Sequence, residues 1–350
     1  MTTVAQSEGR PTDTNFQADA RRRKWRQAGL AYLYILPAAL IMIFITFYPI
    51  GYQIYMSFTD FTIGNLRIDT ATVLPTLLNP PEFLWLENYV RVITGDLALT
   101  NYSFVRILTF NLLWTFVNVF LHVAIGIAIA IALDTKDLPN KRLYRSLFVI
   151  PWALPSLVSG MCWANMWHDR FGGVNLLLQR LGLPGDTRWL LETQPFVDIS
   201  IAGEPVLVLP LAFIAALVAN VWLGWPFMMV IATGALQSIP REVYEAAEVD
   251  GASKWQQFWR ITLPLIRPAM VPAVMIGIML TFNQFNVIFF VTGGGPLGLT
   301  EILVTQGFKL VNPQNLFGVA SAFNIIVFFI LVVLTLITNR VSRATEPYYA

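Results

Sequence analysis

The sequence predicts an all-α integral membrane protein with six transmembrane helices. Of its 350 residues, 56% are hydrophobic and only 13% are charged, whereas a soluble domain has about 25% charged residues. Six stretches each carry the roughly 20 apolar residues that are needed to cross a hydrocarbon core of about 30 Å. The distribution of Lys and Arg between the segments that join these stretches then orients the chain across the bilayer.

The predicted spans are long apolar runs separated by polar segments. They are Leu30–Phe58, Ile107–Leu133, Ser146–Trp167, Val206–Leu236, Ala269–Val291 and Leu316–Thr338. The first run follows the basic stretch RRRKWRQ and so resembles a signal peptide. It is too long for the apolar region of a signal peptide, however, and no A-x-A-like cleavage site follows it. We therefore expect it to be retained as a span.

Six spans place both termini on the same side of the membrane. Of the 23 Lys and Arg residues, 16 fall in the segments on that side and seven on the other. Positive charge marks the cytoplasmic side, so the termini are predicted to be cytoplasmic. We expect a disordered basic tail over residues 1–29, a transmembrane domain over residues 30–340 and a short cytoplasmic tail over residues 341–350.

Three outer segments join the spans on the opposite side. Residues 59–105 form a long, net acidic segment. Within residues 168–205, Val174–Leu181 is apolar enough for a short helix on the membrane surface, and a packed loop is an equal alternative. The stretch TGGGPLGLT at Thr292–Thr300 lacks the Lys-Ser/Thr pair of a phosphate-binding loop, so we predict a tight turn there.

The sequence contains little that could perform covalent chemistry. The P-loop pattern G-x-x-x-x-G-K-[ST] is absent, so the chain is not expected to hydrolyse nucleotide itself. Cys162 is the only cysteine, and no metal-ligand spacing surrounds His122 or His168. His122, in the run NVFLHVAIG, is predicted to pack between helices rather than to relay protons. A net charge of +2 does not suggest a nucleic-acid partner.

Uncharged polar residues within the spans could line a path for a polyol, because amides exchange hydrogen bonds with hydroxyls and aromatic rings cover the apolar face of a sugar. The alternative is that each amide bonds to a neighbouring helix. The cluster in the fifth span lies opposite a fourth span interrupted by Gly and Pro, and it favours a path. The polar residues and the tryptophan that accompanies them are Asn111, Trp114, Asn118, Asn220, Thr281, Asn283, Gln284 and Asn286.

A polar segment, residues 237–268, separates the fourth and fifth spans. Pro240 suits the first turn of a helix, and Gly251 suits its end just after Asp250. Ser253 and Gln256 form a capping box that starts a second helix, and the segment is predicted to end at Pro264 and Pro268. The carboxylates at 242, 245 and 248 spiral around the first helix, which favours a solvated or partner-facing surface over an acid–base pair.

The same segment carries a family motif. Its residues satisfy E-A-A-x3-G-x9-I-x-L-P with Glu245, Ala246, Ala247, Gly251, Ile261, Leu263 and Pro264. This resembles the EAA loop of the permease subunits of binding-protein-dependent ABC importers. The stretches LFVIPWALPSLVSG, VWLGWPFMM, SIPREVYEAAEVDGA and TGGGPLGLTEILVT resemble the maltose and oligosaccharide permeases within that family. The chain departs from the maltose pattern at Thr281 and Gln284, where that pattern has asparagines.

The resemblance implies the type I ABC importer permease fold in the inner membrane of a bacterial cell. It implies four partners: a second homologous permease, two cytoplasmic ABC ATPase subunits and an extracytoplasmic sugar-binding protein. ATP and Mg²⁺ would be bound by the ATPases, and no cofactor is implied for this chain. The implied ATPase-coupling residues are Glu245, Ala246, Ala247, Asp250 and Gly251. The implied substrate-binding residues are Leu223, Gly224, Phe227, Gly277, Leu280, Thr281 and Gln284.

The expected function is therefore transport without catalysis by this chain. The chain would form the membrane path for a disaccharide or oligosaccharide of the maltose, maltodextrin or trehalose kind. One alternative is an importer of glycerol-3-phosphate or another polyol, although a phosphate should require Lys or Arg along the path and no span offers one centrally. A different class of alternative is an ATP-independent channel or secondary carrier, which would need no docking loop for an ATPase.

Overall fold

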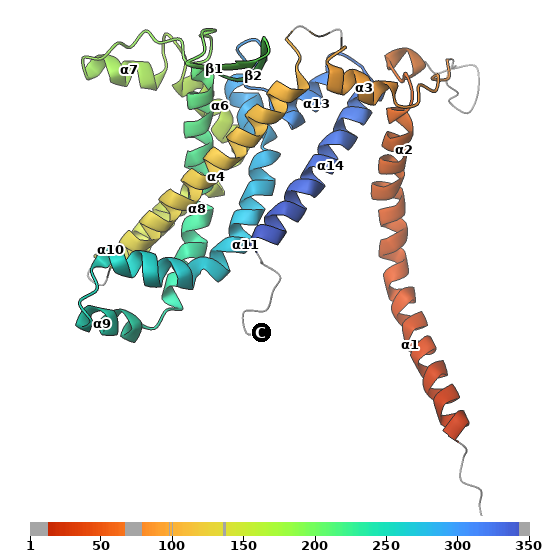
Figure 1. Ribbon diagram of the computed structural model, residues 1–350, viewed down its shortest axis with the longest axis horizontal. Helices are drawn as coiled ribbons and strands as arrows, with labels where there is room; N and C mark the ends of the chain where they lie inside the picture. The colour runs from red at the N-terminus through yellow and green to blue at the C-terminus, as the bar shows by residue number, and fades with distance from the viewer. Residues whose placement is uncertain (1–12, 67–78, 98, 100, 136–137, 343–350) are drawn as a thin grey trace, which may run out of the picture. The chain divides into compact units, whose positions relative to one another are not determined.

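The fold is described from a computed structural model, which covers residues 13–66, 79–97, 99, 101–135 and 138–342. The chain divides into two compact units, Met1–Met56 and Ser57–Ala350. The first is built from α1 (Asp13–Met42), a π-helical turn η1 (Ile43–Phe47) and α2 (Tyr48–Ser57) (Figure 1).

The predicted disordered tail is wrong for residues 13–29, because α1 already begins at Asp13. This part of the chain is rich in Ala, Arg, Lys and Gln, which all have high helix propensity. A helix that is stable within the first span can therefore extend backward through these residues, since nucleation is already complete and each added residue gains one backbone hydrogen bond. Residues 1–12 and 343–350 lie outside the described residues.

The second unit contains the other helices and a β-hairpin. Its elements are η2 (Ile63–Leu66), α3 (Glu87–Thr94), α4 (Phe104–Asp134), α5 (Lys141–Ala153), α6 (Ser156–Met166), α7 (Gly173–Arg180), β1 (Val197–Ile201), β2 (Glu204–Leu209), α8 (Leu211–Gln237), α9 (Arg241–Val249), α10 (Lys254–Gln257), η3 (Phe258–Thr262), α11 (Leu263–Phe282), α12 (Phe285–Val287), η4 (Ile288–Thr292), α13 (Leu303–Val311) and α14 (Phe317–Ser342).

Five helical stretches of the described residues are long and apolar enough to cross a membrane, and a sixth span results if the bent pair α5 and α6 is counted as one. The pair bends by 90°. Leu154 precedes Pro155 and has an extended backbone (φ −80°, ψ 140°), as expected because a proline disfavours helical geometry in the residue before it. The continuous span predicted over Ser146–Trp167 is therefore broken near its middle.

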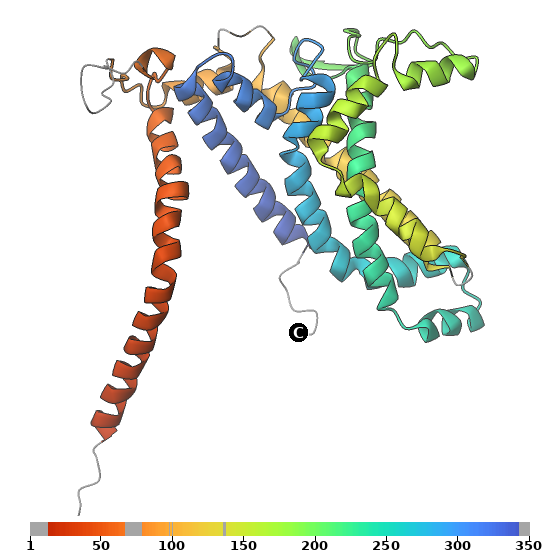
Figure 2. The ribbon, with the colours of Figure 1, turned by 180° about the vertical axis from the view of Figure 1, so that it is seen from behind.

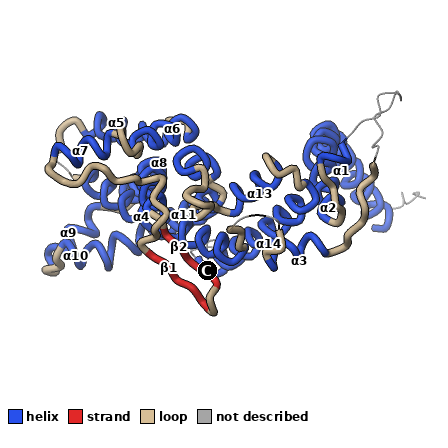
Figure 3. Tube along the Cα trace, turned by 90° about the horizontal axis from the view of Figure 1, so that it is seen from above, coloured by secondary structure: helices blue, strands red, loops and turns tan. Residues whose placement is uncertain are grey.

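The fourth span starts later than predicted. Residues 206–209 belong to strand β2, which pairs antiparallel with β1, and α8 begins only at Leu211 (Figure 3). Pro210 separates the strand from the helix. The apolar run across this proline resembles one long span, because an apolar strand and a buried helix segment have the same hydropathy.

The centre of the second unit is the packing of α4 against α8 and α11. Along α8, Ala212, Ala215, Ala216 and Ala219 are fully buried. Small side chains let transmembrane helices approach closely, and Ala215, Ala216 and Ala219 pack in one cluster with Phe110 and the other buried apolar residues around it.

Different elements form the two ends of the second unit. The α9–α10 segment lies at one end of the helix bundle, whereas α7, the hairpin and α13 lie at the other (Figures 1 and 2). Of the two alternatives left open for Val174–Leu181, the short helix is the one observed, as α7. The predicted glycine turn is confirmed by positive φ angles at Gly293, Gly294 and Gly298.

The polar segment between the fourth and fifth spans has the predicted helix ends. Pro240 caps α9, Gly251 follows it at φ +79°, and Ser253 forms a capping box with Gln256. The second helix does not end at Pro264, however. It continues through a π-helical turn into α11, because a π-turn has a different hydrogen-bond register and absorbs the irregularity at a proline.

Candidate functional site

A pocket of about 300 Å³ opens within the membrane-spanning part of the second unit. It is enclosed by α4, the α5–α6 bend, α8 and the end of α11. Its lining residues are His122, Trp152, Leu154, Ser156, Asn220, Leu223, Gly224, Phe227, Met228, Gly277, Leu280, Thr281 and Gln284.

All seven residues predicted to bind substrate lie in the lining of this one pocket: Leu223, Gly224, Phe227, Gly277, Leu280, Thr281 and Gln284. Two separate spans contribute them: three come from α8, three come from α11, and Gln284 lies two residues after the end of α11. Their exposure differs widely, since Thr281 is 4% exposed and Leu280 is 64% exposed. The pocket therefore has a buried polar side and an open apolar side.

Two glycines allow the helices around the pocket to approach each other. A Cβ atom on Gly224 would lie 2.2 Å from Cε1 of His122, and one on Gly277 would lie 2.7 Å from Cε of Met228. Such distances are shorter than any van der Waals contact. Glycine at 224 is thus required by the His122 ring, whereas at 277 the contact is with the flexible end of Met228, which can move aside.

A chain of amide hydrogen bonds crosses the buried side of the pocket. Asn220 Nδ2 donates to Oδ1 of Asn118 at 2.7 Å, and Gln284 Nε2 donates to Oδ1 of Asn220 at 3.2 Å. Gln284 lies where the fifth span is interrupted, between α11 and α12 (φ −76°, ψ 72°). The chain of bonds therefore connects α4 and α8 to the break in the fifth span.

Other polar residues of the spans are used for helix packing. Asn111 is fully buried and bonds to backbone on both sides, donating to Phe282 O at 3.2 Å and accepting from Leu303 N at 2.8 Å. Trp114 and Asn118 are fully buried as well. Asn286 donates to Ser156 Oγ at 2.8 Å. Asn111 and Asn286 thus bond to neighbouring helices, whereas Trp114 Nε1 has no hydrogen-bond partner among the described residues.

Six lining residues were not among the predicted substrate-binding set: His122, Trp152, Leu154, Ser156, Asn220 and Met228. Trp152 and Ser156 flank the α5–α6 bend, and the Trp152 ring lies 5.9 Å from the ring of Phe227. The two prolines of the stretch IPWALPS could have indicated a break with an aromatic residue inside it. His122 also lines the pocket, although the sequence indicated helix packing alone.

The five residues predicted for ATPase coupling lie on α9 and the turn after it. Glu245, Ala246, Asp250 and Gly251 are exposed, and Ala247 is 8% exposed. An ion pair between Lys254 and Glu248 and a 3.0 Å hydrogen bond between Tyr244 Oη and Thr262 Oγ1 join α9 to the next helix. The segment is therefore internally braced while it presents one open surface.

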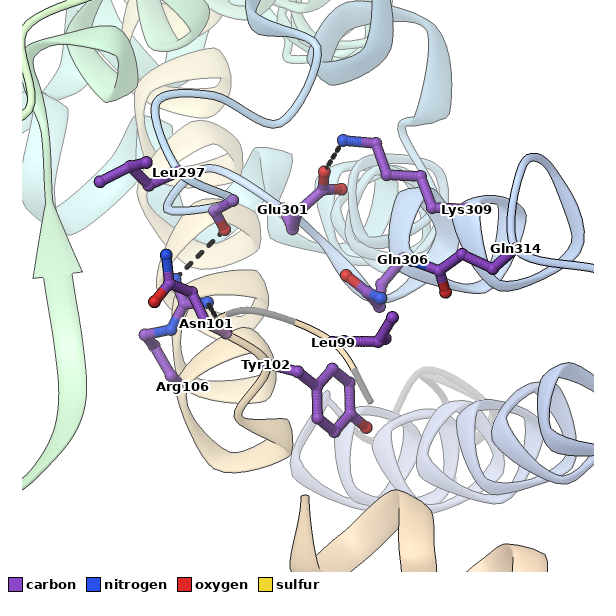
Figure 4. Close-up of a pocket in the computed structure, with 10 residues that line it drawn as sticks. Leu99, Asn101, Tyr102, Arg106, Leu297, Glu301, Gln306, Lys309 and Gln314 are labelled. Atoms are coloured by element: carbon purple, nitrogen blue, oxygen red, sulfur yellow. Dashed lines mark hydrogen bonds and ion pairs between the residues drawn. The ribbon is translucent and has the colours of Figure 1, made fainter. Parts of the chain in front are cut away.

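A second pocket, of about 480 Å³, is lined by residues around α13 and the start of α4 (Figure 4). Its charged groups are bonded to its own walls. Arg106 donates to Gly298 O at 3.2 Å and to Asn101 O at 2.7 Å. Lys309 pairs with the buried carboxylate of Glu301 and donates to Gly293 O at 2.7 Å. These bonds hold the glycine turn against α4 and α13.

Tyr102 closes one side of this outer pocket (Figure 4). Its hydroxyl donates to Val92 O at 2.9 Å, and burial raises the pKa of the phenol above its ordinary value. It therefore remains a neutral hydrogen-bond donor. The outer pocket is larger than the membrane pocket, but its charged groups and this phenol are occupied in bracing the loops around it.

Comparison with known proteins identifies the family. Residues 122–347 match the family described as binding-protein-dependent transport system inner membrane component. The chain is 30% identical to a maltodextrin transport system permease protein of Bacillus subtilis, over 90% of this chain and 69% of that protein. It is also 30% identical to a trehalose/maltose transport system permease protein of Thermococcus litoralis, over 91% of this chain and 96% of that protein.

The fold is shared with a solved structure. A chain of a bacterial ABC transporter involved in the import of the acidic polysaccharide alginate superposes with a TM-score of 0.71 at 19% identity. The match covers 94% of this chain and 100% of the other. The family match, the span pattern and the relatives together show that the chain belongs to the inner membrane components of binding-protein-dependent ABC transport systems.

Proposed function

We propose that this chain is the permease subunit through which an ATP-driven importer moves a neutral disaccharide or oligosaccharide. The observation that carries the proposal is the single pocket whose lining includes all seven residues predicted to bind substrate, from two spans. Among the described residues, its lining contains amide, hydroxyl and aromatic groups but no Lys, Arg, Asp or Glu. The names of the relatives, maltodextrin and trehalose/maltose permeases, support a saccharide.

The lining also separates this proposal from its rivals. A phosphate such as that of glycerol-3-phosphate would be buried without a cation, which costs several kcal/mol. A channel or secondary carrier would have no use for the exposed α9 surface. Both rivals are therefore weaker than an importer of neutral sugar.

In the proposed orientation both termini and α9 face the cytoplasm of a bacterial cell, and the chain crosses the inner membrane six times. A second homologous permease covers the open side of the pocket, where Leu280 is 64% and Trp152 is 54% exposed. Two ATPase subunits, which bind ATP and Mg²⁺, dock on the surface formed by Glu245, Ala246, Ala247, Asp250 and Gly251. A sugar-binding protein docks on the opposite side.

The proposed mechanism is alternating access. When the ATPases close on ATP they displace α9, and because α10, η3 and α11 form one continuous helix, the displacement reaches Gly277 and Thr281 at the pocket. The pocket then opens outward and receives sugar from the binding protein. Hydrolysis returns it to the inward-open state.

The test is reconstitution of the complete transporter in proteoliposomes. We expect uptake of radiolabelled maltotriose that requires both ATP and the binding protein, and no uptake of glycerol-3-phosphate. Uptake that persists without ATP would instead support a channel or carrier. Selective uptake of the phosphate would show that the substrate class is wrong.

A further inference from the structure

We infer that His122 determines specificity in the membrane pocket, with its Nδ1 accepting a hydrogen bond from a hydroxyl group of a neutral saccharide. The inference rests on the proposed function and extends it from a general path to one defined contact. It also replaces the interpretation of His122 as a packing residue alone.

His122 is placed so that its ring borders the pocket. It lies in the middle of α4, is 4% exposed and belongs to the lining. The ring reaches this place only because residue 224 on the facing helix has no side chain, since a Cβ there would lie 2.2 Å from Cε1. The imidazole thus occupies the space that a side chain of α8 would otherwise fill.

One hydrogen bond sets the tautomer of the ring. His122 Nε2 lies 3.0 Å from the backbone oxygen of Asn220. A carbonyl oxygen can only accept, so Nε2 must carry the hydrogen. In a neutral imidazole the other nitrogen, Nδ1, then has a lone pair and no hydrogen.

Nothing in the described part of the chain uses that lone pair. Nδ1 has no hydrogen-bond partner among the described residues, and no carboxylate lines the pocket to stabilise a charged ring. Nδ1 is not among the buried polar atoms that lack a partner, so it is accessible from the pocket. A molecule that enters the pocket, whether water or a ligand hydroxyl, can supply its donor.

The acceptor character of this side of the pocket selects the chemical class of the ligand. Gln284 donates one amide N–H to Asn220, and its Oε1 is a second acceptor in the lining of the same pocket. Sugar hydroxyls can donate to both groups. A carboxylate or phosphate group has no hydrogen to donate to either acceptor.

Two substitutions at one position separate the ligand role from the packing role. In His122→Asn, the amide oxygen replaces Nδ1 as an acceptor but the Nε2 donor is lost. In His122→Gln, the amide nitrogen can still donate to Asn220 O but the acceptor at the Nδ1 position is lost. The matched control is His168→Gln, in the outer segment and outside the pocket lining.

The variants are compared in the complete reconstituted transporter, by the initial rate of maltotriose uptake and by the thermal stability and subunit assembly of the purified complex. We expect His122→Gln to assemble normally and to lose uptake by about 3- to 10-fold, the value of one hydrogen bond. His122→Asn should retain more uptake but melt at a lower temperature. His168→Gln should match the wild type.

The reverse order, with full uptake by His122→Gln and reduced uptake by His122→Asn, would overturn the inference and leave the proposed function intact. A wild-type complex that imports no neutral saccharide would overturn the proposed function and this inference with it.

A second readout uses monofluoro analogues of maltose that the binding protein still binds, because fluorine cannot donate a hydrogen bond. We expect the wild type to transport at least one analogue more slowly than maltose. His122→Gln should transport that analogue and maltose at the same rate. A penalty that persists in the variant would also contradict the contact.

Discussion

At the scale of single residues, two glycines on different helices are distinguished by what surrounds them. A Cβ on Gly224 would overlap the ring of His122, whereas a Cβ on Gly234, ten residues later on the same helix, would meet nothing within 4 Å. The sequence alone shows both as glycines in an apolar helix. Only the facing helix distinguishes a required glycine from a tolerated one.

We expect Gly224→Ala to reduce uptake about tenfold or more and to lower the melting temperature, because overpacking costs about 1–3 kcal/mol. Gly234→Ala is the matched control and should be neutral or slightly stabilising, since alanine is the better helix former. Equal behaviour of the two variants in the uptake and melting assays would show that α4 and α8 do not approach as described.

The ring of Phe227 gives a second test at this scale. It faces Trp152 across the pocket at 5.9 Å, and an aromatic contact contributes about 0.5–1.5 kcal/mol. Phe227→Ala should therefore lower maltotriose uptake about 2- to 10-fold while the complex still assembles. Phe328→Ala, on an exposed part of α14, serves as the control. Unchanged uptake by Phe227→Ala would remove this residue from the site.

At the scale of elements, the turn between α9 and α10 is determined by one glycine. Gly251 has φ +79° and has open space around it, so a new side chain there would be strained only through the backbone and would project outward. Gly203, in the tip of the hairpin, has φ +85° and equally open space. Gly251 and Gly203 therefore have similar backbone conformations but lie at opposite ends of the second unit.

We expect Gly251→Asp to abolish uptake and ATPase co-purification while membrane insertion stays intact, because a carboxylate would obstruct the docking surface. Gly203→Asp imposes the same backbone strain at the opposite end and should keep the ATPases bound. Co-purification followed by an uptake assay measures both effects. If Gly251→Asp retained the ATPases and full transport, the docking surface would have to lie elsewhere.

Asn111 connects three elements and provides a further test. Its amide satisfies the carbonyl of Phe282 at the end of α11 and the N–H of Leu303 at the start of α13. Asn111→Leu leaves both groups buried and unpaired, at about 1–3 kcal/mol each, so the melting temperature of the complex should fall. Asn165→Leu is the control, since this exposed residue bonds only within its own helix. If the two variants melted at the same temperature, the hydrogen bonds of Asn111 would not hold α11 and α13 to α4 as described.

The elements also show what the sequence can and cannot predict. Hydropathy predicted the spans, and local signals at Pro240, Gly251 and Ser253 predicted the ends of α9 and the start of α10. The break at Leu154 and the strand before α8 were missed, because hydropathy does not distinguish a broken span or an apolar strand from a straight helix. The residue before Pro155 was the one available signal for the break.

The same limit applies to the pocket. Leu223 and Gln284 could be proposed from motif resemblance, and both line it. His122 could not, because its role depends on a glycine and a carbonyl about a hundred residues away in sequence. When the role of a residue depends on contacts with a helix that is distant in sequence, a single sequence gives the least information about that role.

At the scale of the whole molecule, one continuous helical path joins the two ends of the proposed mechanism. The α9 surface is connected through α10, η3 and α11 to the break in the fifth span at the pocket. This continuity explains how a protein with no nucleotide loop could respond to nucleotide bound by another subunit.

The measurement that tests the central claim most directly is a structure of the complete transporter, trapped outward-open with maltotriose. We predict sugar density in the pocket between α8 and α11, in contact with Phe227, Leu280 and Gln284, with a hydroxyl within hydrogen-bonding distance of His122 Nδ1. Density confined to the outer pocket beside Arg106 and Glu301, or to the partner permease alone, would contradict the account.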